Sequence, residues 1–130
     1  MLVLDASATV DLLLRNRTGR HVREQLSGQT VWTVVHLDAE VFGALARLYR
    51  DGQLTAHQVR ARLGMLGRLP IERLPIDRQL LDAAWALRRN VAARDALYVA
   101  AATALDARLL TTDRRLVRAV GDITFTPDNA

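Results

Sequence analysis

The sequence predicts an α/β fold in which a mostly parallel sheet of about five strands is covered by helices on both faces. Short apolar runs alternate with longer amphipathic segments along the 130 residues, and strands that alternate with helices favour a parallel sheet. Half of the residues are apolar and a quarter are charged, as in ordinary globular domains. The chain has no linker-like or low-complexity segment, so we expect one domain over residues 1–130.

The predicted strands are short and mostly apolar. In chain order they are Leu2 to Leu4, Val31 to Val34, Glu72 to Leu74, Arg108 to Thr111, and Thr124 to Phe125. Open sheets of this kind bind ligands beyond the carboxyl ends of their strands. The residues that directly follow a strand are therefore the first candidates for a functional site.

The predicted helices show apolar residues at helical spacing and capping residues at their ends. Thr55 and Asp77 can each cap the N-terminus of a helix, and Gly52 suits a helix C-terminus. The apolar stripes from Leu37 to Leu69 can form either core or a homodimer face, and core is the preferred interpretation. We expect helices near Ser7 to Leu14, Gly19 to Leu26, Leu37 to Tyr49, Ala56 to Leu69, Arg78 to Arg89, Arg94 to Leu105, and Arg114 to Val120.

The composition excludes several classes of protein. The absence of cysteine removes disulfides, thiolate zinc sites and thiol nucleophiles. Asp5 interrupts the N-terminus too early for a signal peptide, and no apolar run reaches the roughly 18 residues that span a bilayer. We therefore expect a cytoplasmic protein without a membrane segment.

The basic residues favour an anionic partner. All eighteen are arginines and the net charge is +4. Arginine forms forked hydrogen bonds to phosphate, so nucleic acid is the first candidate. A solvated surface in an arginine-biased proteome is the alternative, and the charge alone leaves it open.

Four acidic residues are expected at one edge of the sheet. Asp5 and Asp113 each follow a predicted strand. Glu40 lies in the first turn of the helix after the second strand, and Asp95 opens the helix before the fourth. Clustered carboxylates repel one another unless a cation lies between them. Hard divalent ions select oxygen ligands, so Mg²⁺, or Mn²⁺ as its substitute, is the natural candidate. Each acid alone has a simpler explanation as a helix cap or a solvated residue, and only the joint pattern indicates a site.

These motifs resemble a known family. The order "LVLDAS", "LDAEVFGALARL", "RDALYVAAATAL" and "LLTTDRRL" is similar to that of PIN-domain ribonucleases, and more narrowly to that of the VapC toxins of bacterial type II toxin-antitoxin pairs. The resemblance implies a PIN-like three-layer α/β/α sandwich, usually dimeric. It implies a metal-dependent endoribonuclease whose partners are single-stranded or looped RNA and a cognate VapB-like antitoxin, the C-terminal segment of which blocks the active site.

The resemblance also assigns roles to residues. It implies that the catalytic metal site is formed by Asp5, Glu40, Asp95 and Asp113. Thr111 matches a hydroxyl position that supports this site, and Ser7 is a weaker candidate for the same role. Arg94 departs from the pattern, since relatives often carry an aromatic or apolar residue before the aspartate.

The corresponding mechanism is metal-assisted phosphodiester hydrolysis. The sequence leaves open whether one or two Mg²⁺ ions bind: one ion would lower the pKa of a bound water, and a second, about 4 Å away, would stabilise the leaving oxygen. Three arginines lie nearest to the acids in sequence and are candidates for holding the RNA backbone, with plain surface charge as the alternative: Arg94, Arg114 and Arg115. The histidines show no metal-ligand spacing, and we expect them to be structural or exposed: His21, His36 and His57.

Other α/β enzymes fit the sequence less well. Haloacid-dehalogenase-like phosphatases want a second aspartate two residues after the first, where this chain has Ser7. Response-regulator receivers and P-loop enzymes need a lysine, and this chain has none. The alternative from a non-enzymatic class is a catalytically inactive PIN-like adaptor that binds RNA or protein, and the sequence leaves it open.

Overall fold

The computed structural model describes residues 1–127, and these form a five-stranded sheet in which every pairing is parallel. The strand order is β3-β2-β1-β4-β5. The strands are β1 (Leu2–Leu4), β2 (Val31–Val34), β3 (Glu72–Leu74), β4 (Arg108–Leu110) and β5 (Thr124–Phe125). The predicted α/β class and the five predicted strands are confirmed, with β4 ending one residue before Thr111.

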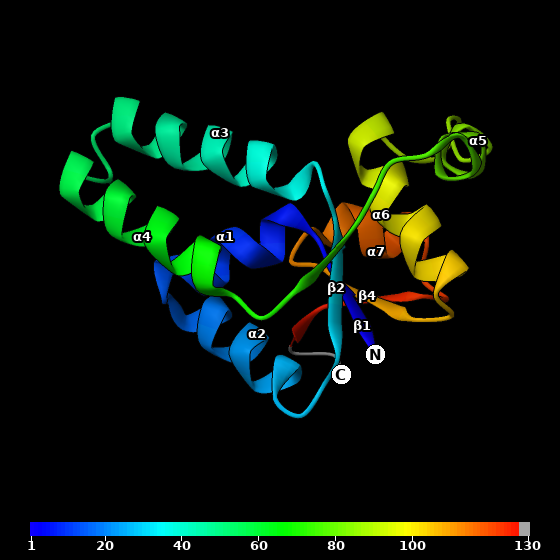
Figure 1. Cartoon of the computed structure of the whole chain (residues 1–130), viewed down its shortest axis with the longest axis horizontal. Helices are drawn as coiled ribbons and strands as arrows, with labels where there is room; N and C mark the ends of the chain where they lie inside the picture. Colours follow the sequence, from blue (N-terminus) through cyan, green and yellow to red (C-terminus); the bar gives the residue numbers. More distant parts are fainter. Residues whose placement is uncertain (128–130) are drawn as a thin grey trace.

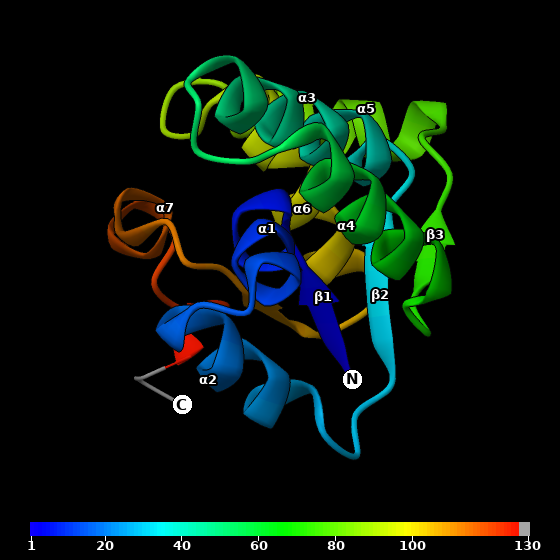
Figure 2. The same cartoon turned by 90° about the vertical axis from the view of Figure 1, so that its left-hand side faces the viewer.

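The helices form two layers on opposite sides of the sheet (Figure 1). One layer holds α1 (Ala6–Leu14), α2 (Arg17–Leu26), α3 (Leu37–Arg50) and α4 (Ala56–Arg68). The other holds α5 (Arg78–Trp85), α6 (Ala93–Ala104) and α7 (Arg114–Ala119). Figure 2, turned by 90°, shows α1 and α2 in front of β1, with α6 behind it. This arrangement is the predicted three-layer sandwich.

The strand order reverses at the centre of the sheet. From β1 the chain moves outward through β2 to β3, and it then crosses back to β4 on the other side of β1. Leu4 pairs with Leu110, and the Asp5 amide donates a 3.3 Å hydrogen bond to the Leu110 carbonyl. Such a reversal point is where open α/β sheets bind ligands. The residues that follow β1 and β4 therefore lie side by side at the edge where a site is expected.

The two central strands form the floor of the core. Val3, Leu4, Leu109 and Leu110 are fully buried. Helix α6 contacts β1, β2 and β4, and its buried face carries a run of small alanines that lets the helix approach the sheet closely. The helix predicted near Arg94 to Leu105 is therefore confirmed, and most of its apolar residues are buried. Within residues 1–127, no helix is long and apolar enough to cross a membrane.

The apolar stripes of α3 and α4 belong mainly to the core. The buried side chains among them are Leu37, Val41, Leu45 and Leu66, which agrees with the preferred interpretation. Phe42 and Tyr49 on α3 remain exposed.

Two predicted helix boundaries were wrong. Helix α5 ends at Trp85 and does not reach Arg89, because the amides of Leu87 and Arg88 bond three residues back, to Ala84 and Trp85. These tight turns bring Val91 into the core before α6 begins. The other predicted helix ends agree to within one residue, apart from the start of α2.

Helix α2 begins at Arg17 and not at Gly19. The side chain of Asn16 accepts a 2.7 Å hydrogen bond from the Gly19 amide, and this N-cap was missed. The predicted caps are confirmed, since Thr55 forms a capping box with Gln58 and Asp77 accepts from the Leu80 amide. Gly52 has the positive φ of 75° that suits a helix end.

Gly19 sits where α1 and α2 touch. A Cβ added to it would lie 1.9 Å from the carbonyl oxygen of Asp11 and 2.6 Å from its carbon. Because both atoms belong to the backbone of α1, no side-chain rotation relieves the overlap. The two helices need glycine at this position.

We predict that Gly19→Ala destabilises the protein by roughly 1–3 kcal/mol, because the helices must move apart. Gly67→Ala on α4 is the matched control, since its added Cβ meets no atom within 4 Å and alanine favours helix by up to about 1 kcal/mol. Urea unfolding of both variants measures the difference. Equal stability of the two variants would contradict the close approach.

Candidate active site

Four acidic side chains line one pocket at the carboxyl edge of the sheet. The pocket has a volume of about 200 Å³. Its acids come from four different segments: Asp5 follows β1, Glu40 lies on α3, Asp95 lies on α6, and Asp113 precedes α7. The sequence places these four residues at one edge of the predicted sheet, and the structure brings all of them to one pocket.

Asp5 is held by donors from the first turn of α1 and from the residue that follows β4. Its side chain is 2% exposed. As the N-cap of α1 its Oδ1 accepts hydrogen bonds from the Ala8 amide at 2.9 Å and from the Ser7 hydroxyl at 2.8 Å. Its Oδ2 accepts a short hydrogen bond from the Thr111 hydroxyl. Asp5 therefore both caps α1 and accepts hydrogen bonds from the two hydroxyl groups, Ser7 and Thr111, that were predicted to support it.

The two hydroxyls also fix the segment after β4. Ser7 Oγ accepts from the Thr112 amide at 3.1 Å, and Thr111 Oγ1 accepts from the Asp113 amide at 3.0 Å. Each hydroxyl therefore donates to Asp5 and accepts from the backbone that leads to Asp113. This network sets the position of Asp113 relative to Asp5.

Burial dominates the electrostatics of Asp5. It raises the pKa of the carboxyl to about 6, although the hydrogen bonds from Ala8, Thr111 and Ser7 oppose the change. The charge of Asp95 raises the pKa further. Asp5 is therefore costly to ionise in the folded protein without a nearby positive charge.

Glu40 is contacted by three groups from α6 and the start of α3. The Tyr98 hydroxyl donates to Glu40 Oε1 at 2.6 Å, and His36 Nε2 lies 3.4 Å from the same oxygen. Arg94 Nε lies 3.5 Å from Oε2. Burial and the hydrogen bond to Glu40 raise the pKa of Tyr98 far above its ordinary value, so the phenol stays protonated.

Asp95 and Asp113 repel each other. Burial raises the pKa of Asp95, as do the charges of Asp113 and Glu40, while Arg94 and Arg115 lower it. Asp113 caps α7 by accepting from the Arg115 amide at 3.0 Å, and the Arg115 side chain lies 3.8 Å from it. The pocket thus carries an excess of negative charge that the nearby arginines offset in part.

A second hollow of about 240 Å³ shares Arg94, Asp95 and Asp113 with the acidic pocket. Arg115 also lines it, so two of the three predicted arginines border the acids. Arg114 is exposed and lies outside the residues that line these two hollows. The arginines at the mouth provide positive charge directly beside the acidic pocket.

Three further residues lie at this site that were not among its predicted members. Tyr98 lies among apolar residues of one predicted helix, so its hydroxyl gave no functional signal. His36 was expected to be structural or exposed. Arg47 lines the acidic pocket from α3. Helical spacing offers a signal for two of them, because His36 precedes Glu40 by four residues and Arg47 follows it by seven.

The donor set fits a hard divalent cation. Carboxylate oxygens are its preferred ligands, and the mutual repulsion of Asp95, Asp113 and Glu40 is what a cation would relieve. Within residues 1–127, however, no three His, Cys, Asp or Glu side chains form a group compact enough to hold a metal ion as they stand. The four acids line one pocket and carry suitable ligand oxygens, but their side chains are too far apart to coordinate one ion without moving.

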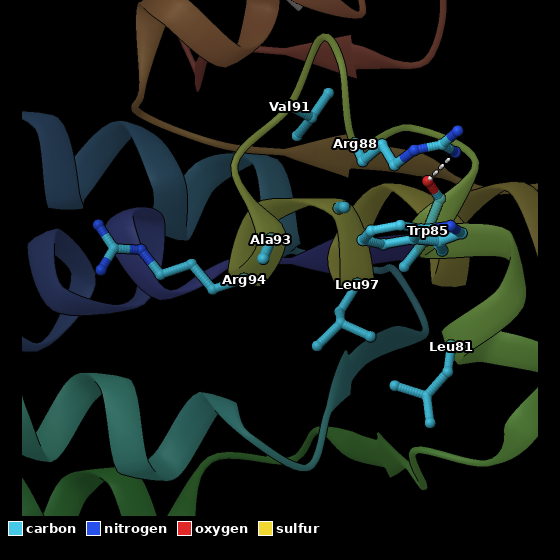
Figure 3. Close-up of a pocket in the computed structure, with 9 residues that line it drawn as sticks. Leu81, Trp85, Arg88, Val91, Ala93, Arg94 and Leu97 are labelled. Atoms are coloured by element: carbon cyan, nitrogen blue, oxygen red, sulfur yellow. Dashed lines mark hydrogen bonds between the residues drawn. The ribbon is translucent and has the colours of Figure 1, made fainter.

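An apolar pocket of about 450 Å³ lies beside the acidic one, between α5 and α6. Trp85, which is 67% exposed, and Leu81 line it, and the Arg88 guanidinium lies 4.7 Å from the Trp85 ring centre. Arg94 borders both pockets. Figure 3 shows its side chain directed away from Trp85.

Comparison with known sequences identifies relatives over nearly the full length. The PIN domain family model matches residues 2–122. Ribonuclease VapC1 of Mycobacterium tuberculosis is 42% identical over 120 residues, which cover 92% of this chain and 90% of the relative. Ribonuclease VapC3 of the same organism is 43% identical over 118 residues, which cover 90% of this chain and 85% of the relative.

Solved structures share the fold at low sequence identity. FitAcB from Neisseria gonorrhoeae superposes with a TM-score of 0.76 at 19% identity, and both chains are covered completely. The Mycobacterium tuberculosis toxin VapC20, described as cleaving the sarcin-ricin loop, has a TM-score of 0.69 at 16% identity, with 92% of this chain and 95% of that chain covered. Taken with the family match and the sequence relatives, the chain belongs to the PIN-domain family and, within it, to the VapC ribonuclease toxins of toxin-antitoxin systems.

Proposed function

We propose that this protein is a metal-dependent endoribonuclease toxin that hydrolyses RNA phosphodiester bonds at the acidic pocket. The observation that carries the proposal is the meeting of Asp5, Glu40, Asp95 and Asp113, from four separate segments, in one pocket. Four independent helix caps or surface acids have no reason to meet in this way. The identity of about 42% to VapC ribonucleases supports the same activity.

The four carboxylates would hold Mg²⁺, with Mn²⁺ as a substitute. When bound, such an ion supplies charge for the scissile phosphate and activates a water molecule for attack. Ser7 and Thr111 orient Asp5 by donating to its two oxygens. The chain itself then needs no nucleophile, which agrees with the absence of cysteine.

The arginines around the pocket would hold the RNA backbone. Arg94 and Arg115 border the acids directly, Arg47 adds a cation from α3, and Arg114 follows Asp113 in sequence. Phosphate contacts of this kind position a nucleic acid without reading its sequence. The site thus combines an acidic centre for the cation with a basic margin for the polyanion.

The expected protein partners are an antitoxin and a second copy of the chain. Structural neighbours include a toxin-antitoxin complex from Klebsiella pneumoniae and FitAB bound to a DNA fragment. We propose that a cognate VapB-like antitoxin inhibits this chain in the cytoplasm. For a homodimer, exposed apolar side chains such as Phe42, Leu81 and Trp85 offer contact area.

An inactive adaptor is the second candidate. The observation that favours it is the absence, among residues 1–127, of a group of side chains compact enough to hold a metal ion as it stands. Titration with a divalent metal separates the two functions. RNA binding that is unaffected by the ion, with no product formed, would support the adaptor.

We predict that Asp95→Asn abolishes RNA cleavage and leaves the fold intact, because the amide is nearly isosteric but a poor ligand for a hard cation. Purified wild type and variant are compared with Mg²⁺, with Mn²⁺ and with EDTA, on structured and single-stranded RNAs. Asp82→Asn, at an exposed aspartate of α5, is the matched control and should cleave normally. Equal cleavage by wild type and Asp95→Asn would remove Asp95 from the site.

We also predict that Asp95→Asn is at least as stable as wild type in EDTA. A raised carboxyl pKa means that ionisation at neutral pH disfavours the folded state. The stability advantage of the variant should be present at pH 7.5 and shrink as the pH falls toward the ordinary carboxyl pKa. Thermal melts across this range measure it. A large loss of melting temperature at pH 7.5 would indicate a structural role for Asp95 at the start of α6.

We predict that metal affinity falls when the pH drops below about 6. With its pKa raised to about 6, Asp5 holds a proton below that pH, and the proton competes with the cation. Relative to pH 7.5, Mn²⁺ titrations should show a drop in affinity of roughly twofold at pH 6.0 and roughly tenfold at pH 5.0 for one displaced proton. Equal affinity at pH 7.5 and 5.0 would exclude Asp5 as a ligand with this pKa.

A further inference from the structure

We infer that Tyr98 is a positioning residue for Glu40, holding one carboxylate oxygen so that the other is left for the cation. The inference rests on the proposed function, in which Glu40 is a metal ligand. It concerns a residue that the acidic motif does not include. Tyr98 lies one turn after Asp95 on α6, so a single helix carries one acid and the group that orients another.

The contact is short, and it joins a buried tyrosine to a partly buried glutamate. The Tyr98 side chain is 1% exposed, and its hydroxyl donates to Glu40 Oε1 at 2.6 Å. A phenol has a single proton, and that proton is committed to Glu40. Short hydrogen bonds from a hydroxyl to a carboxylate are among the strong ones in proteins. The hydrogen bond thereby fixes Glu40 Oε1. Among the contacts described above for residues 1–127, Glu40 Oε2 lies near only the exposed Arg94 side chain, with Arg94 Nε 3.5 Å away.

His36 supports the tyrosine from the other side. Its ring stacks on the Tyr98 ring with centroids 4.4 Å apart and planes 27° apart. Its Nε2 lies 3.1 Å from the Arg94 carbonyl oxygen, while its Nδ1 is buried without a hydrogen-bond partner within residues 1–127. The proton therefore belongs on Nε2, where it can be donated to that carbonyl. His36 thus links the start of α3 to the start of α6 and restricts the ring that holds Glu40.

A metal site gains from such a restraint. A glutamate has more rotatable bonds than an aspartate, and fixing it costs side-chain entropy that a cation would otherwise have to offset. Groups that orient a ligand in this way commonly change metal affinity or activity by 10–100-fold when removed. Asp5 is oriented by the hydroxyls of Ser7 and Thr111. Tyr98 orients Glu40 in the same way, and it leaves one carboxylate oxygen of Glu40 to bind the cation.

The chain provides a matched control. It has two tyrosines, and the other one, Tyr49 on α3, is exposed. Tyr98→Phe and Tyr49→Phe each remove one hydroxyl from the same kind of side chain. Glu40→Gln serves as the reference for loss of the ligand itself.

The experiment measures Mn²⁺ binding without RNA. Each purified protein is titrated with Mn²⁺ at pH 7.5, and the free ion is followed by electron paramagnetic resonance. Thermal melts in EDTA report stability independently of the metal. We expect the Kd of Tyr98→Phe to rise roughly tenfold and that of Tyr49→Phe to match wild type. The Mg²⁺ concentration for half-maximal RNA cleavage should rise by the same factor as the Kd of Tyr98→Phe.

The outcomes separate this inference from the proposed function. If Glu40→Gln weakens Mn²⁺ binding and Tyr98→Phe binds like wild type, the role of Tyr98 is overturned and the metal site stands. The same conclusion follows if Tyr98→Phe lowers the melting temperature in EDTA without changing the Kd, because its role is then structural. If wild type binds no Mn²⁺, the proposed metal site fails, and the inference fails with it.

Discussion

The buried carboxylate of Asp5 is the interaction on which the rest of the site depends. It caps α1 through the Ala8 amide, and it joins the end of β1 to the end of β4 by accepting from Ser7 and Thr111. The same two hydroxyls receive the amides that lead to Asp113. One negative charge in the interior therefore starts a helix, ties the two central strands together and positions a second acid.

The unfavourable ionisation of the buried acids explains why the pocket suits a cation. Burial and the neighbouring acids raise the pKa values of Asp5 and Asp95, so the folded chain holds negative charge that its surroundings disfavour. In the structure, arginines offset part of this charge, with Arg94 near Glu40 and Arg115 near Asp113. A divalent cation in the pocket would take over that role and release the arginines to contact phosphate. The acidic residues would thus bind the cation, and the arginines around them would bind the RNA backbone.

Much of the architecture could be predicted because it follows from local pattern. Short apolar runs ending in Asp5 and Asp113 indicated both the strands and the edge at which they end, and parallel topology then placed the two acids together. The missed features depend on tertiary contacts. In the sequence, Tyr98 is one more apolar residue of a helix. Only the folded arrangement of α3 and α6 brings Glu40 to its hydroxyl. The early end of α5 at Trp85 likewise reflects the burial of Val91, which no local signal announces.

The central claim is that the four acids form one site for a divalent cation, and Mn²⁺ diffraction tests it most directly. Crystals of the metal-free protein are soaked in Mn²⁺, and the anomalous scattering of the ion locates it without assumptions about the chain. The account predicts a peak in the acidic pocket, within bonding distance of oxygens from Asp5, Glu40, Asp95 or Asp113, with Arg94 moved away from Glu40. A fully soaked crystal with no peak there, or with Mn²⁺ bound elsewhere on the surface alone, would contradict the account.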